Sequence, residues 1–217
     1  MYNLCEPQFG PDILLRGSIV IKQDWILLGV YMKIVVFADS HGDKETMKLF
    51  IEKLGPETVI FLGDGAEDIL ALENEYPELR FEYVKGNCDT IESVPTEKLI
   101  SLDGFNFYLS HSDMYDYRFD TDKIVKCARE KGASLFLHGH THTPTLWSDN
   151  EITIMNPGTV RNKPGMGCAT CGLIYTYESR FICKILFAAF ISFYIDDIIS
   201  ANAIRLEMET GDGACRS

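Results

Sequence analysis

The feature that most constrains the fold is an alternation of short apolar runs with amphipathic segments in the first half of the chain. Residues 34–38 form a β-branched run of strand length, and residues 58–62 and 80–85 form two more such runs. The segments between them, residues 44–54 and 66–76, have the apolar spacing of amphipathic helices. This order of strand, helix, strand, helix and strand predicts a sheet that is covered by its connecting helices.

The second half of the chain has a mostly β pattern. Residues 97–102 and 105–110 are expected to pair as a hairpin, because only a short turn separates them. Residues 121–131 have the pattern of a third helix, and residues 134–138 have that of a further strand. Short strands are also expected at residues 145–147, 152–155, 172–177 and 181–185. The two halves together predict a mixed α/β domain in which a pair of sheets is covered by helices.

Length and charge exclude several classes of protein. The chain has 217 residues, of which 46% are hydrophobic, and this is enough for one well-buried domain. Its formal net charge of -12 argues against broad nucleic-acid binding, which needs a lysine and arginine surface. The most apolar window, residues 185–195, is shorter than the ~20 residues of a membrane-spanning helix. We therefore expect no membrane association, and we consider a homo-oligomer compatible with the sequence.

The seven cysteines indicate the compartment. Their number is odd and their positions are scattered, which is not typical of a disulfide framework. We therefore expect a reducing, cytoplasmic compartment. Cys168 and Cys171 form a single C-x-x-C pair with no second pair, and we interpret them as free thiols rather than as a zinc or redox site.

The two ends of the chain differ from its middle. Met32 directly precedes the first predicted strand, and residues 1–31 have no clear period and no catalytic feature. Our hypothesis is that Met32 is the functional start and that residues 1–31 are an extension outside the native protein. Residues 32–186 would then form the domain, and residues 187–217 a tail of unknown structure.

Each of the first three predicted strands is followed by an oxygen or nitrogen donor close to a glycine. Asp39 and His41 follow the first strand, Asp64 follows the second, and Asn87 follows the third. The spacing of Asp39 and His41 places both side chains on one side if the extended conformation continues. Since ligand sites in α/β sheets gather at the carboxyl ends of strands, these donors are candidates for a shared site.

All five histidines lie in three short stretches in the middle of the chain. His41 lies in the first stretch, His111 in the second, and His138, His140 and His142 in the third. Imidazoles together with carboxylates suit divalent manganese, iron, zinc or nickel. His138 is the exception, because strand alternation points it away from His140 and His142; we expect it to have a structural or supporting role.

These segments, in this order, resemble the motifs of the calcineurin-like metallophosphoesterases. The motifs are Asp39-x-His41, Gly63-Asp64, Gly86-Asn87, His111 and Gly139-His140-x-His142. The Gly-Asn-Cys-Asp form and the small size are similar to the compact bacterial and archaeal phosphodiesterase branch, which includes relatives of the retromer subunit. The resemblance covers residues 32–185 and implies a four-layer sandwich of two mixed β-sheets flanked by helices.

The resemblance implies a site for two divalent metal ions. We expect manganese, with nickel, iron and zinc as alternatives. The implied ligands of the first ion are Asp39, His41 and His142. The implied ligands of the second ion are Asn87, His111 and His140, and Asp64 would bridge both ions. Of these ligands, Asp64, Asn87 and His111 are also the expected catalytic residues.

The implied activity is phosphodiester hydrolysis of a small phosphoester substrate by a hydroxide that the two metals activate. One alternative is a phosphomonoesterase or nucleotidase on the same site, since the pocket walls select the substrate. A second alternative is a retromer-like scaffold for protein interactions without catalysis. Such a scaffold would be expected to lack at least one ligand histidine, and every ligand position is filled here.

The chain departs from the broader family at one motif position. Cys88 stands where many members have a histidine that is thought to protonate the leaving group, and a thiol with an ordinary pKa of ~8.5 is a poor substitute. We therefore weigh a catalytic role for Cys88 against simple packing beneath the loop, with Asp89 or an ordered water as other candidates for the acid. Residues 156–159 resemble the family's Asn-Pro-Gly-Ser turn, which we expect to be structural and near the site.

Overall fold

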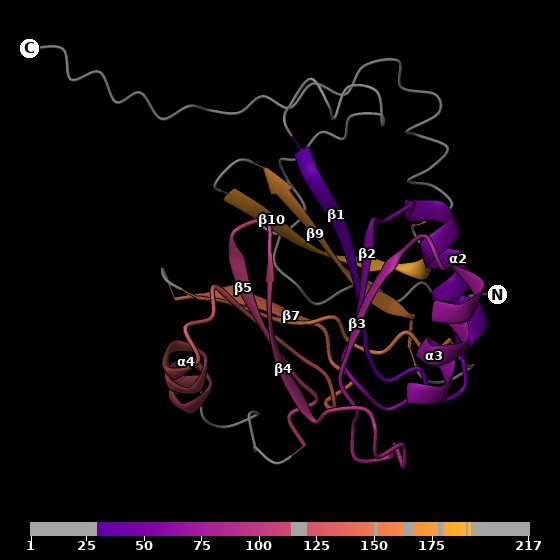
Figure 1. The fold of residues 1–217 in the computed structure, drawn as a ribbon, viewed down its shortest axis with the longest axis horizontal. Helices are drawn as coiled ribbons and strands as arrows, with labels where there is room; N and C mark the ends of the chain where they lie inside the picture. Colours follow the sequence, from indigo (N-terminus) through magenta and orange to yellow (C-terminus); the bar gives the residue numbers. More distant parts are fainter. Residues whose placement is uncertain are drawn as a thin grey trace, which may run out of the picture.

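The structure is a computed structural model that describes residues 30–113, 121–149, 152–162, 167–177, 180–189 and 191. Its described part consists of two five-stranded sheets packed face to face, with helices on the outer faces (Figure 1). This arrangement confirms the predicted α/β class and the predicted pair of helix-covered sheets.

The two sheets are formed by different parts of the chain. The first sheet has the strand order β10-β9-β1-β2-β3 and the second has the order β4-β5-β6-β8-β7. The strands of the first sheet are β1 (Val30–Phe37), β2 (Thr58–Phe61), β3 (Arg80–Tyr83), β9 (Thr170–Tyr177) and β10 (Arg180–Phe187). The strands of the second sheet are β4 (Glu97–Leu102), β5 (Phe105–Ser110), β6 (Leu135–His138), β7 (Thr145–Ser148) and β8 (Thr153–Asn156). The helices are α2 (Lys44–Leu54), α3 (Ala66–Glu75) and α4 (Thr121–Glu130).

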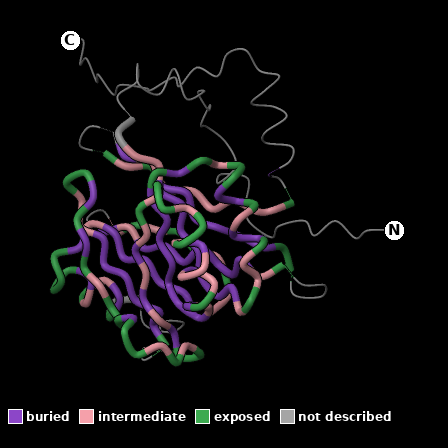
Figure 2. The backbone as a smooth tube through the Cα atoms, turned by 45° about the vertical axis from the view of Figure 1, so that its right-hand side comes forward, coloured by how far each residue is buried: buried purple, intermediate pink, exposed green. Residues whose placement is uncertain are grey.

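Three apolar clusters hold the four layers together. Side chains alternate along β1, so Ile34 and Val36 enter the cluster between the sheets, whereas Val35 and Phe37 pack against α2 and α3. A third cluster joins the second sheet to α4. The purple core of Figure 2 runs through these layers. Because Phe37 is fully buried, its replacement by alanine is expected to cost about 3–5 kcal/mol of stability.

The sheet topology places the carboxyl ends of several strands at one edge of the molecule. Strands β1, β2 and β3 are mutually parallel, as are β5, β6 and β8. Four of the five predicted motif segments directly follow β1, β2, β5 and β6, and the fifth follows β3 after a short connection. The fold therefore brings donors that are far apart in the sequence to a common site.

Several element ends differ from the sequence-based expectation. Strands β2 and β3 end at Phe61 and Tyr83, although the next residues are still apolar and buried. The chain turns toward the site at these points, and an apolar pattern does not mark such a turn. Strand β1 begins at Val30, two residues before Met32, with a register shift between them.

At the other end of the domain, β10 continues to Phe187, and Ile191 is buried against the cluster that contains α2 and α3. The backbone N–H of Ala188 also donates to the carbonyl of Ala169. None of the helices that the structure describes is long and apolar enough to cross a bilayer. The remaining residues of the predicted tail and the predicted extension at residues 1–29 lie outside the described residues.

Candidate metal centre

The loops that carry the predicted ligands have unusual backbone conformations. Five of the seven predicted ligands have a positive φ, and these are Asp39, His41, Asp64, His140 and His142. Such a conformation costs roughly 1–2 kcal/mol in a residue with a side chain, and it is concentrated at functional sites. The expected extended continuation of the chain after Asp39 is therefore wrong, because tight turns direct these side chains together.

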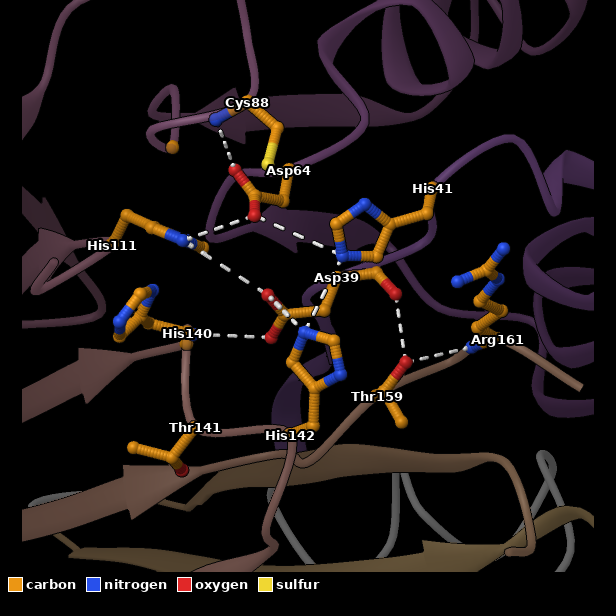
Figure 3. A network of polar contacts seen from close by, with 12 residues as sticks. Asp39, His41, Asp64, Cys88, His111, His140, Thr141, His142, Thr159 and Arg161 are labelled. Carbon is orange, nitrogen blue, oxygen red and sulfur yellow. Dashed lines mark hydrogen bonds and ion pairs between the residues drawn. The ribbon is translucent and has the colours of Figure 1, made fainter. Parts of the chain in front are cut away.

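Asp39, His41 and His142 form the first group of donors, as the sequence predicts. One atom of each lies within 4.8 Å of the others. The Nε2 atoms of the two histidines are 3.3 Å apart, and Oδ1 of Asp39 lies 3.3 Å from Nε2 of His142 (Figure 3). The Asp39 carboxylate beside the ring raises the pKa of His142, and this effect outweighs that of burial.

Asp39, Asp64 and His111 form a second, fully buried group. Nε2 of His111 is 3.5 Å from Oδ2 of Asp64 and 4.0 Å from Oδ1 of Asp39. The Nδ1 atom of His111 lies 2.7 Å from the Leu62 carbonyl. Donation from Nδ1 to this carbonyl leaves the Nε2 lone pair directed at the carboxylates, which is the orientation that a metal ligand needs.

The ionisation of this second group follows from its contacts. Burial alone would raise the pKa of Asp64, but the neighbouring His111 imidazole and a hydrogen bond from the backbone of Cys88 hold the pKa well below its usual range. Burial would likewise lower the pKa of His111, yet the carboxylates of Asp64 and Asp39 raise it overall. Asp64 is therefore ionised in this centre, and its two carboxylate oxygens are available to bind a cation.

Asn87 and His140 lie beside the second group. Oδ1 of Asn87 is 3.0 Å from Nδ1 of His140, and the ring of His140 packs edge-on against His111 with the ring centroids 5.2 Å apart. The backbone N–H of His140 donates to Oδ2 of Asp39 at 3.1 Å. All seven predicted ligands are thus brought into one centre, although Asn87 and His140 contact each other rather than Asp64.

Two buried atoms test whether the residues suit a metal. Oδ1 of Asp39 and Nε2 of His111 have no hydrogen-bond partner among the described residues, although Asp39 is fully buried and His111 is 1% exposed. A buried polar atom without a partner costs about 1–3 kcal/mol, and more when it is charged. Both atoms belong to groups with three convergent donors, and carboxylates with imidazoles bind borderline divalent ions. The donor set therefore fits a divalent metal.

Two glycines permit the close approach of the ligand loops. A side chain at Gly63 would meet the backbone of Gly86 at 2.5 Å and the ring of His111 at 2.8 Å. A side chain at Gly86 would meet Oδ1 of Asp64 at 2.1 Å. Any larger residue would force the loops apart, so these glycines are required by packing at the site.

Cys88 faces the site and is exposed, so the interpretation that it packs beneath the loop is wrong. Its thiol belongs to a third group of donors with His41 and Asp64. The Asp64 carboxylate accepts a hydrogen bond from this thiol, and together with burial it raises the pKa of Cys88 to about 11. Without a metal, Cys88 is therefore a neutral thiol at physiological pH.

Asp89, a candidate for the general acid, is bound to backbone N–H groups. Its two carboxylate oxygens accept the backbone N–H groups of four residues at 2.8 Å, namely Asp64, Gly65, Ala66 and Gly86. Because both oxygens are occupied by donors, the geometry does not support Asp89 as the general acid. Asp89 instead connects the loop of Asn87 to the loop of Asp64 and to the start of α3.

The turn at residues 156–159, which is expected to be structural and near the site, is hydrogen-bonded to both halves of the centre. Nδ2 of Asn156 donates to the carbonyl of Gly139 at 2.8 Å and to the Thr141 hydroxyl at 3.0 Å. The hydroxyl of Thr159 donates to the carbonyl of Asp39 at 2.7 Å. The similarity of residues 156–159 to the family's turn indicated that this segment lies near the site. A sequence motif alone does not show which residues the turn contacts.

His138 has the supporting position that the sequence predicts. It is buried, its ring stacks on Phe136 with centroids 5.5 Å apart, and it belongs to none of the described donor groups. Burial lowers its pKa to about 4, so it is neutral at physiological pH. Cys168 and Cys171 are not joined by a disulfide.

A pocket of about 260 Å³ opens beside the centre. It is lined by His41, Asp64 and Cys88 from the site and by residues at the start of α3 and after β3. Four of its lining residues are acidic, namely Asp64, Glu67, Asp68 and Asp89, and none is a lysine or arginine. The pocket lies where a substrate group would contact the candidate metal ligands.

Comparison with known proteins agrees with this geometry. The sequence is similar to a probable metallophosphoesterase of Methanocaldococcus jannaschii, with 27% identity over 139 residues that cover 62% of this chain and 71% of that protein. Its fold is similar to that of a predicted phosphoesterase from Streptococcus pneumoniae, with a TM-score of 0.60, 24% identity, and coverage of 72% of this chain and 89% of that chain.

The fold is also similar to that of a single mutant of Vps29 from Entamoeba histolytica, with a TM-score of 0.58, 18% identity, and coverage of 72% of this chain and 99% of that chain. The sequence model of the calcineurin-like phosphoesterase superfamily domain matches residues 32–179 of this chain. With its ordered motifs, its two helix-covered sheets and its convergent donors, this chain belongs to the calcineurin-like phosphoesterase superfamily.

Proposed function

We propose that this protein is a metal-dependent phosphodiesterase with a site for two divalent ions. The observation that carries this proposal is the pair of unpartnered buried atoms, Oδ1 of Asp39 and Nε2 of His111, each within a group of three convergent donors. A purely structural cluster would be expected to satisfy such atoms with hydrogen bonds. Family membership supports the same conclusion.

The proposed assignment of ligands follows the two halves of the centre. Asp39, His41 and His142 would hold one ion, and Asn87, His111 and His140 the other, with Asp64 shared between them. When bound, two such ions supply a lowered pKa for water and positive charge for the phosphoryl oxygens. Manganese is the proposed metal, with nickel, iron and zinc as alternatives, because the donors are a mixture of oxygen and imidazole nitrogen.

The chain's own residues orient these ligands. His111 is fixed by the Leu62 carbonyl, and the carboxylate of Asp64 is fixed by the backbone N–H of Cys88 at 2.8 Å. Contacts of this kind around a ligand typically contribute 10–100-fold to metal affinity or activity. The proposed centre is therefore held in place before any substrate binds.

The pocket supports a diester rather than a monoester substrate. Its lining has four carboxylates and no lysine or arginine. A phosphodiester carries one negative charge near neutral pH, whereas a phosphomonoester carries nearly two, so the carboxylates oppose the monoester more strongly. We therefore place diester hydrolysis ahead of the phosphomonoesterase or nucleotidase alternative.

The scaffold alternative has weaker support. The similarity to Vps29 is one of fold, because the sequences are only 18% identical. All seven predicted positions carry a residue that can ligate a metal, which a scaffold for protein interactions would not require. The described cysteines are all free, and we place the protein in the cytoplasm.

A screen of metals against phosphoesters tests the proposal. Purified protein would be stripped with a chelator, reloaded with manganese, nickel, iron or zinc, and assayed on bis(4-nitrophenyl) phosphate and on 4-nitrophenyl phosphate. We expect metal-dependent turnover with a higher kcat/KM for the diester. A preference for the monoester would favour the phosphatase alternative, and the absence of turnover with every metal would favour the scaffold.

A further inference from the structure

Arg161 follows the turn at residues 156–159 and has a buried guanidinium nitrogen, Nε, without a hydrogen-bond partner among the described residues. An arginine is always charged near neutral pH, and its N–H donors match phosphate and carboxylate groups. An unpaired buried donor of this kind needs an acceptor that the described residues do not supply.

The backbone around Arg161 is fixed against the first ligand loop. The N–H of Val160 donates to the carbonyl of Ala38 at 3.1 Å, and the N–H of Arg161 donates to the hydroxyl of Thr159 at 3.1 Å. The N–H of Asn162 donates to Oδ2 of Asp43 at 2.7 Å. Arg161 is thus held between contacts to both ends of the loop that carries Asp39 and His41.

The direction of the side chain follows from the same segment. Val160 is fully buried in the cluster with α2 and α3, whereas the Thr159 hydroxyl contacts the Asp39 carbonyl. Figure 3 shows the Arg161 side chain running alongside His41, on the outer side of that residue. The guanidinium therefore lies on the His41 side of the proposed metal site.

The negative charge of the pocket lining favours a nearby cation for binding an anionic substrate. The pocket on the Asp64 and Cys88 side is lined by four carboxylates and by no lysine or arginine. An anionic phosphoryl group is opposed by that wall, so a fixed cation on the other side would favour its binding. Charge-assisted hydrogen bonds from arginine to phosphate oxygens are strong and often bidentate.

We propose that Arg161 binds the phosphoryl group of the substrate and sets its orientation at the metal centre. This inference rests on the proposed phosphoesterase function and adds a substrate-binding residue to it. Arg161 is not a proposed metal ligand, so its removal should change phosphate affinity without changing metal content.

The test compares inorganic phosphate binding by manganese-loaded wild type, Arg161→Gln and Arg161→Lys, measured by titration calorimetry. In Arg161→Gln the dissociation constant is expected to rise by roughly tenfold or more, with an equal rise in KM for bis(4-nitrophenyl) phosphate. Arg161→Lys should recover part of the loss, because a lysine keeps the charge but not the planar fork. The manganese content of both variants should match that of the wild type.

Arg180→Gln is the matched control. Arg180 is exposed and pairs with Tyr177 at the end of the sheet opposite to the site, where β1 begins at Val30. Its replacement should leave the phosphate affinity unchanged. If Arg161→Gln does not fold, a loss of phosphate affinity in Arg161→Lys relative to the wild type still supports the inference.

Wild-type phosphate affinity in both Arg161 variants would overturn the inference, as would a wild-type protein that binds no phosphate. The outcome is separable from that of the proposed function. Normal hydrolysis with unchanged phosphate binding in the variants contradicts only the role of Arg161. Phosphate binding that depends on Arg161, in a protein that hydrolyses no ester with any metal, contradicts only the proposed hydrolysis.

Discussion

The carboxylate of Asp89 accepts the backbone N–H of Asp64 at 2.8 Å, which fixes the backbone of a proposed metal ligand through a residue that is not itself a proposed ligand. Its oxygens also accept three further backbone N–H groups from the two neighbouring loops. Helix α3 has no side-chain cap of its own, since its N-cap is Gly65. Asp89 therefore serves both as a distant cap for α3 and as a support for the metal centre.

Asp89→Asn should weaken the metal centre as well as the fold. The amide would place a donor against backbone donors, and lost hydrogen bonds to a charged group are worth about 1.5–3 kcal/mol each. We expect a fall in melting temperature and a roughly 10–100-fold higher manganese requirement for activity. Asp103→Asn is the control, because Asp103 accepts a hydrogen bond from Thr176 away from the site. An equal manganese requirement in the two variants would show that Asp89 acts on stability alone.

Removal of a proposed ligand should abolish turnover without unfolding the protein. Asp64→Asn removes the carboxylate that the two metals are proposed to share, and His140→Ala removes an imidazole beside His111. We expect kcat on bis(4-nitrophenyl) phosphate to fall by more than the roughly 100-fold that supporting contacts can cost. Circular dichroism would confirm the fold. Turnover like that of the wild type in either variant would refute the assigned role.

The thiol of Cys88 should resist alkylation in the metal-free protein. The pKa of Cys88 is raised to about 11 by its hydrogen bond to Asp64 and by burial, so very little thiolate is present at pH 8. Iodoacetamide labelling followed by mass spectrometry should show slower modification of Cys88 than of a model peptide thiol with a pKa of ~8.5. In Asp64→Asn, labelling should accelerate. Fast labelling of the wild type at pH 8 would contradict the hydrogen-bonded thiol.

The buried His138 should make the fold sensitive to mild acid. Its folded pKa is lowered to about 4 by burial, while its unfolded pKa is ~6.5. As the pH falls from about 6.5 to 4, the unfolded state takes up a proton that the folded state does not, so stability falls, by up to about 3 kcal/mol. Above pH 6.5 both states are neutral and His138 contributes no pH dependence.

Urea unfolding of chelator-treated protein at pH 5.0 and pH 7.0 measures this effect. His138→Gln keeps a polar side chain that does not titrate, so the difference in unfolding free energy between the two pH values should be smaller than in the wild type. An unchanged difference would show that His138 is not the group responsible.

The arrangement of strands and helices was predictable from the sequence, because it depends on local patterns. The alternation in β1 is visible in the chain, and it explains why Val35 and Val36 face different layers. The turns at Asp39 and His41 were not predictable, since their positive φ values depend on contacts with the loop of Asp64. Contacts of this kind join residues that are distant in sequence, and no local pattern marks them.

The same limit explains the residues that were missed or misinterpreted. Asp89 was considered as an acid because of its position, whereas three of its four backbone partners come from a loop more than 20 residues away. Arg161 lies in a segment with no periodicity, and the backbone next to it is held by the contact of Asn162 with Asp43, which is 119 residues distant. A motif identifies the chemistry of a site, but only the folded chain shows how that chemistry is supported.

The most direct test of the account is the metal content of purified protein, measured by elemental analysis together with turnover of bis(4-nitrophenyl) phosphate. The account predicts about two divalent ions per chain, as expected of a two-metal site, with turnover that is lost on chelation and restored by manganese or one of its alternatives. A chain that binds no metal and shows no metal-stimulated turnover would contradict it.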